Sequence, residues 1–290
     1  MALTLNLEKG YINVGSVRTF LDVLESIDDI DNFVYFYRGH ASNKYEIKPS
    51  IYRNDGWIEN EHKMFREIML RCPQDFYESD NAFQKLVKMQ HYSMPTRLLD
   101  VSENPLIALY FACSTNKEKN LSGEVIIFKV PKKEIKYYDS DTVSVLSNLA
   151  KRPSTFSINK FPSMSLDEFN KKEEIKLLLH EIKQEKPYFQ PCIDPNHIRT
   201  VLCVKPKLDN PRIIRQNGAF FLFGCNNEKL RCADLPDSYV HQPDGNKVFI
   251  KSREKTKILK QLCMLGITEA SIYPEIDHVA SYIKQNFETP

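Results

Sequence analysis

The sequence predicts an α+β protein with a central mixed or antiparallel β-sheet flanked by helices. Apolar, aromatic and β-branched runs such as 33–37 and 124–130 are typical of buried strands. Stretches with apolar residues at helical spacing separate these runs, without the regular alternation of strand and helix found in a parallel α/β fold. With 290 residues, of which 42% are apolar and 27% charged, the chain is predicted to fold around a large core. This length allows one large domain or two small ones, and we expect one, 1–290.

The N-terminal half is expected to begin with a helix and to return to helix between its strands. Apolar spacing predicts helices over 14–30, 57–71, 80–92 and 105–114. Strands are predicted over 33–37, 94–99 and 123–130. Pro105 suits an early helical position, and Ser102 or Asp100 is expected to cap that helix.

Residues 131–200 are predicted to form a helical insertion within the domain. Acidic and basic residues alternate around Ile175, Leu178 and Ile182, a pattern typical of an amphipathic helix over 166–186. Beyond the insertion, strands are expected at 201–204, 219–224, 248–250 and 267–274. Helices are expected at 253–265 and 275–286, and Gly266 is expected to end the first of these.

Composition and charge limit the classes of function. The formal net charge of +2 gives no support for a nucleic-acid or membrane surface. Glycine occurs only nine times and no Walker or GxGxxG motif is present, so a bound nucleotide would not be held by those devices. No apolar run is long enough to cross a bilayer, and the N-terminus lacks the pattern of a signal peptide. We therefore expect a cytoplasmic protein with no membrane partner.

The seven cysteines are scattered along the chain, and none forms a CxxC pair. This distribution favours reduced thiols in a cytoplasm. Cys225 and Cys232 are residues of a type that binds zinc, but no second pair supports such a site. We therefore expect no metal.

Polar side chains are concentrated in the stretch 90–100, shortly before the apolar segment 105–113. Its hydrogen-bonding and charged side chains include Gln90, His91, Thr96, Arg97 and Asp100. Polar groups held against an apolar segment need hydrogen-bond partners, because leaving them unpaired is unfavourable. The stretch therefore predicts either a satisfied structural network or a binding site.

Individual residues of this stretch allow two interpretations. His91 is either a hydrogen-bonded residue at a helix end or a catalytic group. Arg97 and Asp100 are expected to pair with each other, which would orient the loop and add little stability.

A second polar group, Arg38, Gly39 and His40, follows the predicted strand 33–37. An arginine at a strand end offers a fork of donors suited to a phosphate or a carboxylate. Gly39 permits an unusual backbone conformation or the close approach of a ligand. The structural alternative is that Arg38 pairs with a core carboxylate and Gly39 only turns the chain.

These motifs together resemble the FRG domain family, which is named for an aromatic-Arg-Gly motif. The motif stands here as Tyr37-Arg38-Gly39-His40. The resemblance continues through 49–53, 90–100, 105–112, 216–220 and 266–274, so it extends from residue 33 to about residue 275.

The order of the motifs is similar to that of ADP-ribosyltransferase folds, which implies a split central sheet. In those folds an early Arg or His beside Gly binds NAD+, and a late strand carries a catalytic Glu. The resemblance implies Glu269 for this carboxylate, with Glu275 and Gln216 as competitors. The catalytic residues that it implies are Glu269, His91 and Arg38. The cofactor-binding residues that it implies are Tyr37, Arg38, Gly39, His40, Gln90, Thr96, Arg97, Asp100, Tyr110 and Gln216.

The resemblance thus implies an ADP-ribosyltransferase or NAD+ glycohydrolase that uses NAD+ as substrate and needs no metal. The acceptor of ADP-ribose would be water or a macromolecule, either a protein or a nucleic acid. A role as a toxin or in phage defence would add an antitoxin or inhibitor protein as partner. The alternatives are a non-catalytic nucleotide- or nucleic-acid-binding module, and a nuclease that uses His91 or His40.

Overall fold

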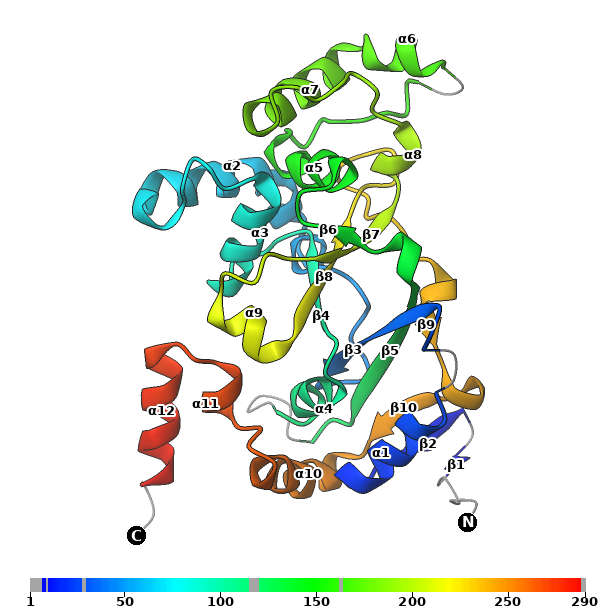
Figure 1. The fold of residues 1–290 in the computed structure, drawn as a ribbon, viewed down its shortest axis with the longest axis vertical. Helices are drawn as coiled ribbons and strands as arrows, with labels where there is room; N and C mark the ends of the chain where they lie inside the picture. The colour runs from blue at the N-terminus through cyan, green and yellow to red at the C-terminus, as the bar shows by residue number, and fades with distance from the viewer. Residues whose placement is uncertain (1–6, 9, 28–29, 115–119, 162–163, 288–290) are drawn as a thin grey trace.

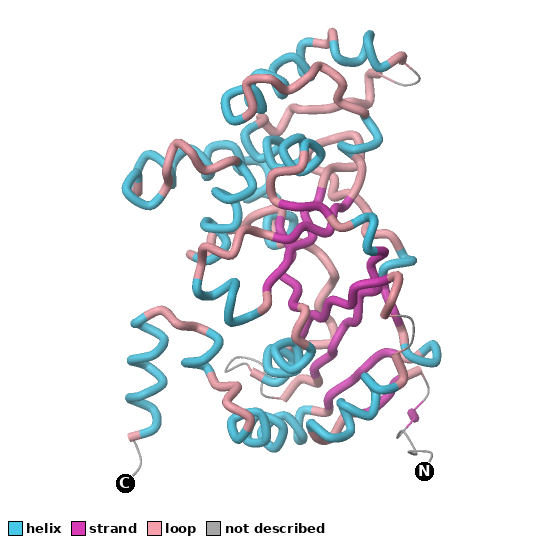
Figure 2. Tube along the Cα trace, viewed as in Figure 1, coloured by secondary structure: helices cyan, strands magenta, loops and turns pink. Residues whose placement is uncertain are grey.

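The computed structural model describes residues 7–287 with the exception of 9, 28–29, 115–119 and 162–163. In these residues one open, mixed β-sheet runs through the middle of the molecule, with helices toward both ends (Figures 1 and 2). The strands are β1 (Leu7–Glu8), β2 (Tyr11–Asn13), β3 (Phe33–His40), β4 (Leu98–Ser102), β5 (Gly123–Pro131), β6 (Lys136–Tyr137), β7 (Val201–Lys205), β8 (Gly218–Phe223), β9 (Val240–His241) and β10 (Lys247–Ile250). The α+β class predicted from the sequence is confirmed.

The strands follow one another across the sheet in the order β1-β2-β10-β5-β3-β4-β8-β7-β6, and β9 pairs with β5 away from this path. The pairs β2–β10 and β6–β7 are parallel, whereas the other pairs are antiparallel. Strands distant in the sequence are therefore neighbours, as β4 and β8 are, and this brings separate motifs together.

Strands β3 and β4 pair with each other over a very short length. Strand β3 pairs with β5 along its whole length, from Phe33 opposite Pro131 to His40 opposite Glu124. It pairs with β4 at a single position, Tyr37 opposite Ser102. Because the two strands separate after this pair, the end of β3 has no partner among the described strands on that side.

Three large hydrophobic clusters pack on the sheet, two of them between the sheet and its helices. One joins α2, α3, α5 and α7 to β4, β7 and β8, and a second packs α1, α4 and α10 against β2, β3, β5 and β10. A third lies around Phe36, Phe128 and Phe221. The helices are α1 (Val17–Glu25), α2 (Asp55–Arg71), α3 (Ala82–His91), α4 (Pro105–Cys113), α5 (Asp141–Asn148), α6 (Leu166–Asn170), α7 (Glu173–Glu185), α8 (Pro195–Ile198), α9 (Pro211–Gln216), α10 (Ser252–Met264), α11 (Glu269–Ile272) and α12 (Ile276–Asn286).

Gly39 allows helix α4 to lie directly on β3. A Cβ atom built at this position would stand 1.9 Å from the carbonyl oxygen of Ala108 and 2.5 Å from the backbone nitrogen of Ala112. Gly39 is therefore needed for packing of a helix on a strand, not for a turn. The helix begins at Pro105 as expected, but its cap is Asn104, whose Oδ1 accepts the Leu106 N–H at 3.0 Å, and not Ser102 or Asp100.

The segment 131–200 contains helices α5 to α8 and one short strand, β6, which pairs with β7 at the end of the sheet. Helices α6 and α7 lie at the top of the molecule in Figure 1. The buried residues of α7, Ile175, Leu178 and Ile182, belong to the same cluster as α3 and α5, so its charged face is turned to solvent.

Two of the predicted strands differ from the structure. The segment 267–274 contains the helix α11, because Thr268 and Ser271 form a capping box: each hydroxyl accepts the backbone N–H of the other residue. The strand predicted at 94–99 begins only at Leu98 and continues to Ser102. Within the described ranges, no helix is long and apolar enough to span a bilayer.

Candidate functional site

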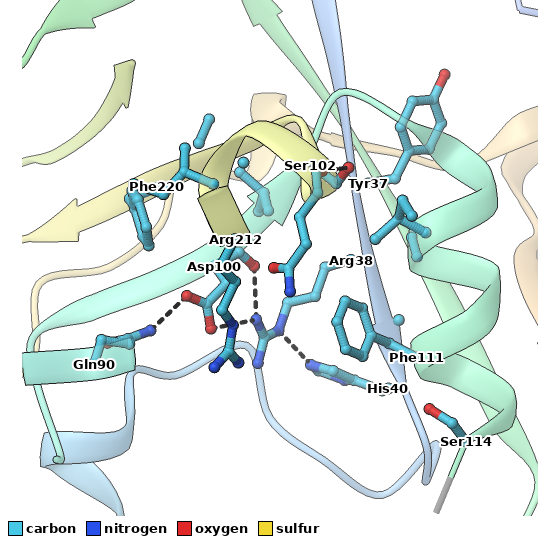
Figure 3. A pocket seen from close by; sticks show the side chains of 18 of the residues that line it. Tyr37, Arg38, His40, Gln90, Asp100, Ser102, Phe111, Ser114, Arg212 and Phe220 are labelled. Carbon is cyan, nitrogen blue, oxygen red and sulfur yellow. Dashed lines mark hydrogen bonds and ion pairs between the residues drawn. The ribbon is translucent and has the colours of Figure 1, made fainter. Parts of the chain in front are cut away.

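A pocket of about 360 Å³ lies where β3 and β4 separate (Figure 3). Strand β3 contributes Tyr37 to His40, β4 contributes Asp100 to Ser102, and α4 forms one wall. The other walls come from the ends of α3 and α9, from the turn Ser50–Arg53, and from Tyr273 after α11. Segments spread from residue 37 to residue 273 thus meet at one opening in the sheet.

Arg38 crosses the gap between the two strands. Its Nη1 donates a hydrogen bond to the backbone oxygen of Asp100 at 2.6 Å and lies 3.8 Å from that residue's Oδ2. Its Nε donates to Nε2 of His40 at 3.1 Å. Burial lowers the pKa of Arg38, and the Asp100 carboxylate opposes this effect. Because the ordinary pKa of a guanidinium is so high, Arg38 remains a cation at neutral pH.

Asp100 is held from two sides yet remains accessible. Gln90 Nε2 donates to Asp100 Oδ1 at 2.7 Å, and the hydroxyl of Thr96 donates to Gln90 Oε1. The Asp100 side chain is 54% exposed. The chain Thr96–Gln90–Asp100 therefore orients a carboxylate at the pocket while leaving part of it free to meet a ligand.

Two further arginines line the pocket. Arg53 donates from Nε and Nη2 to the backbone oxygen of Lys48 at 3.2 and 2.9 Å. The guanidinium carbon of Arg212 lies 4.6 Å from the ring centroid of Tyr273, and its Nη1 lies 3.8 Å from Glu275 Oε1. With Arg38, the lining holds three guanidinium groups from three distant segments, opposed by the carboxylate of Asp100.

His40 and His91 are neutral at pH 7. Burial, with the charge of Arg38, lowers the pKa of His40 to about 3. Burial, with the charge of Arg212, lowers the pKa of His91 to about 4. His40 accepts a hydrogen bond at Nε2, so its proton lies on Nδ1. Both residues thus offer uncharged imidazoles to the pocket.

Residues 34–121 match the model of the FRG domain. This part of the chain is an FRG domain. The match runs from β3 past the end of α4, and it contains Arg38, Arg53, Gln90 and Asp100. No curated protein and no solved structure gives a significant match to the chain.

The FRG domain supplies only part of the pocket. Arg212 and Gln216 come from α9 and Tyr273 follows α11, all beyond residue 121. Gln216 also donates from Nε2 to the backbone oxygen of Ile272 at 3.2 Å, so it ties α9 to α11 beside the pocket. The site is therefore completed by the C-terminal half of the chain.

Arg97 of the FRG domain lies outside the pocket lining. Its side chain is fully buried, with Nε and Nη2 donating to the two carboxylate oxygens of Glu61 at 2.9 and 2.5 Å. Lys229 Nζ lies 3.1 Å from the same carboxylate. The predicted pair of Arg97 with Asp100 is wrong, because Arg97 points into the core, where Glu61 of α2 binds it, whereas the Asp100 side chain is exposed at the pocket.

The structure separates the other predicted site residues into three groups. Tyr37, Gly39, His40, Gln90, His91 and Gln216 line the pocket together with Arg38 and Asp100. Thr96 is buried and acts through Gln90. Tyr110 and Glu269 line an adjacent cavity, which shares only Ser114 and Tyr273 with the pocket. Glu269 begins helix α11 and lies 3.7 Å from Nδ1 of His278, not on a sheet strand as expected.

Arg53 and Arg212 were not predicted as site residues. Arg53 ends a short segment that contains the buried Ile51 and Tyr52, and Arg212 follows a proline at the start of α9. An arginine next to buried residues is a weak signal in sequence, and only the fold shows that both reach one pocket. Among the described residues, no group of three or more His, Cys, Asp or Glu side chains could hold a metal ion.

Proposed function

We propose that this pocket binds NAD+ and that the protein breaks the nicotinamide–ribose bond, passing ADP-ribose to water or to a macromolecular acceptor. The observation that carries the proposal is the meeting of Arg38, Arg53 and Arg212 with an accessible carboxylate, Asp100, in one pocket. An ADP-ribosyltransferase-like arrangement of the chain is part of this proposal.

The three arginines suit a diphosphate. Guanidinium groups bind phosphate oxygens through paired, charge-assisted hydrogen bonds. Among the described lining residues they outnumber the carboxylates, although Glu275 lies beside Arg212. Arg38 is already fixed by its bonds to His40 and to the Asp100 backbone, so little freedom is lost when it meets an anion. The ring of Phe111 offers apolar surface for a base.

Asp100 is the carboxylate placed to act on the sugar. When the bond from ribose C1′ to nicotinamide breaks, both electrons leave with the nicotinamide nitrogen, and the sugar gains positive charge. A fixed carboxylate would stabilise that charge electrostatically. The nucleophile then bonds to C1′ and releases its proton to solvent. In this proposal Asp100 takes the role first assigned to Glu269, which lies in the adjacent cavity.

A second candidate function is nucleotide binding without catalysis. It is favoured by the position of Glu269 outside the pocket and by the bonds that Gln90 and Arg38 already make to Asp100. Such a module would use the same arginines to bind a nucleotide phosphate and would leave its glycosidic bond intact.

Incubation of the full chain with NAD+ labelled in nicotinamide separates the two functions. Release of nicotinamide that is lost in Asp100→Asn, while binding measured by calorimetry persists, would support catalysis. Binding without release in the wild type would support the second candidate. Arg71→Ala provides a control, because Arg71 is an exposed arginine of α2 that pairs with Glu67 away from the pocket. If the wild type binds neither NAD+ nor ADP-ribose, the first proposal is wrong.

A further inference from the structure

Cys225 and Cys232 lie opposite each other in a short hairpin that follows β8. The Asn226 N–H donates to the Arg231 oxygen at 2.8 Å, and the Ala233 N–H donates to the Gly224 oxygen at 3.5 Å. These two hydrogen bonds flank the cysteines, which therefore form a non-hydrogen-bonded pair of an antiparallel ladder. In such a pair the Cα atoms are about 4.5 Å apart and both side chains project from the same face.

That spacing falls within the range of a disulfide. Bridged cysteines have Cα atoms about 4.4–6.8 Å apart. Both residues are free thiols, Cys225 fully buried and Cys232 half-buried. Since the hairpin already holds the two backbones together, the remaining adjustment is a rotation of the side chains.

We propose that Cys225 and Cys232 form a thiol–disulfide site that an oxidising disulfide, such as oxidised glutathione, converts into an intramolecular bridge. The half-buried Cys232 reacts first. Its thiolate attacks one glutathione sulfur, the other glutathione leaves as a thiolate, and a mixed disulfide results. The Cys225 thiolate then attacks the Cys232 sulfur and displaces the second glutathione. Two protein thiols are oxidised, and one glutathione disulfide is reduced to two thiols.

Burial makes this reaction slow at neutral pH. It raises the pKa of Cys225 to about 11 and that of Cys232 to about 12, although the nearby Arg97 guanidinium opposes the shift in both. Because the thiolate is the attacking species, exchange requires alkaline conditions or long incubation.

The bridge would fix the hairpin that carries Lys229. This lysine reaches the buried pair of Glu61 and Arg97, and Arg97 directly precedes β4 of the FRG domain. Oxidation would therefore restrain the hairpin whose Lys229 contacts Glu61, and through Glu61 and Arg97 the start of the strand that bears Asp100. We expect the oxidised protein to unfold at a higher temperature than the reduced protein, because a bridge restricts the unfolded chain.

The experiment equilibrates the full chain in mixtures of reduced and oxidised glutathione above pH 8, followed by acid quenching and blocking of free thiols. Trypsin cleaves after Lys229 and Arg231, so a bridge joins the peptides 216–229 and 232–247 in the mass spectrum. The expected result is this joined pair, with loss of two of the seven thiols.

Matched variants complete the test. Cys203→Ala should still yield the joined peptides, because Cys203 is a buried cysteine that lies opposite Phe221 on β8. Cys232→Ala should abolish the joined pair and the rise in unfolding temperature. The proposal would be overturned if Cys225 and Cys232 both remain free thiols in the most oxidising mixture. It would also be overturned if glutathione stays attached to Cys232 in the wild type.

Discussion

Arg38 of β3 donates a hydrogen bond to the backbone oxygen of Asp100 on β4 at 2.6 Å, across the gap where the two strands no longer pair. The side chain thus replaces ladder hydrogen bonds that the separated backbones do not make. The same guanidinium lines the pocket, so one residue contributes both to the sheet and to the proposed binding of an anion.

Replacement of Arg38 is expected to weaken NAD+ binding. Arg38→Lys keeps the charge but loses the fork that reaches both His40 and Asp100, so we expect the dissociation constant to rise at least tenfold, which is about 1.4 kcal/mol. Calorimetric titration measures the change, with Arg71→Lys as a control on the exposed face of α2. Equal affinity in Arg38→Lys and wild type would show that Arg38 does not meet the ligand.

Glu61 is expected to be essential for stability. Although burial alone would raise the pKa of Glu61, Arg97 and Lys229 hold it below its ordinary value, so the carboxylate is charged at pH 7. Glu61→Gln leaves two buried cations without compensation and should lower the free energy of unfolding by about 3–5 kcal/mol. Urea denaturation measures this loss. Glu67→Gln, which removes an exposed partner of Arg71 on the same helix, should change stability by about 1 kcal/mol or less.

Gly39 should respond to alanine far more strongly than Gly56. Gly39→Ala forces a methyl group into the backbone of α4 and should destabilise the protein by about 1–3 kcal/mol or prevent folding. Gly56 lies in the first turn of α2, and a Cβ there meets only the side chain of Asn54, at 3.2 Å. Asn54 Oδ1 also caps α2 by accepting the Trp57 N–H, so the gain in helix propensity is offset by crowding of the cap. Gly56→Ala should therefore change the stability by less than about 1 kcal/mol. Thermal unfolding of both variants decides the matter, and a stable, fully active Gly39→Ala protein would contradict the packing described.

Stability should fall as the pH is lowered from about 6.5 toward 4. The folded pKa of His91 is about 4 and that of His40 about 3, whereas an unfolded histidine titrates near about 6.5. Between these values the unfolded chain binds protons that the folded chain does not, so the stabilisation present above pH 6.5 is lost on acidification. Each histidine contributes up to about 1.4 kcal/mol per pH unit in this window.

Chemical denaturation at several pH values tests this dependence. His91→Asn should flatten the slope between pH 6.5 and 4, whereas His180→Asn, a change at an exposed position of α7, should leave it unchanged. An unaltered slope in His91→Asn would show that His91 does not carry this share of the dependence.

Several residues that line the pocket lie in stretches that the sequence singled out, because the signals of those stretches are local. The aromatic-Arg-Gly-His motif ends a buried strand, and the polar stretch 90–100 lies beside an apolar helix. Both face the same pocket, with Arg38, Gln90 and Asp100 in contact. Burial of polar groups requires hydrogen-bond partners, so this stretch predicted either a satisfied network or a binding site.

What the sequence did not reveal depends on contacts between distant segments. The partner of Arg97 is Glu61, which shares the buried face of α2 with Ile58 and Phe65. Helical spacing places Glu61 on this face, but only the fold brings the face to Arg97. Apolar content at 267–274 fits a strand as well as a short helix, and the capping box of Thr268 and Ser271 decides for the helix. As a result Glu269 lies in the adjacent cavity, while Tyr273, a few residues later, reaches the pocket.

The single pair of residues that joins β3 to β4 means that the backbone barely connects the two halves of the sheet at its centre. An anion bound by both Arg38 of β3 and Arg212 of α9 would add a contact between the two halves. Binding of an anion in the pocket would then link the two halves of the sheet mechanically.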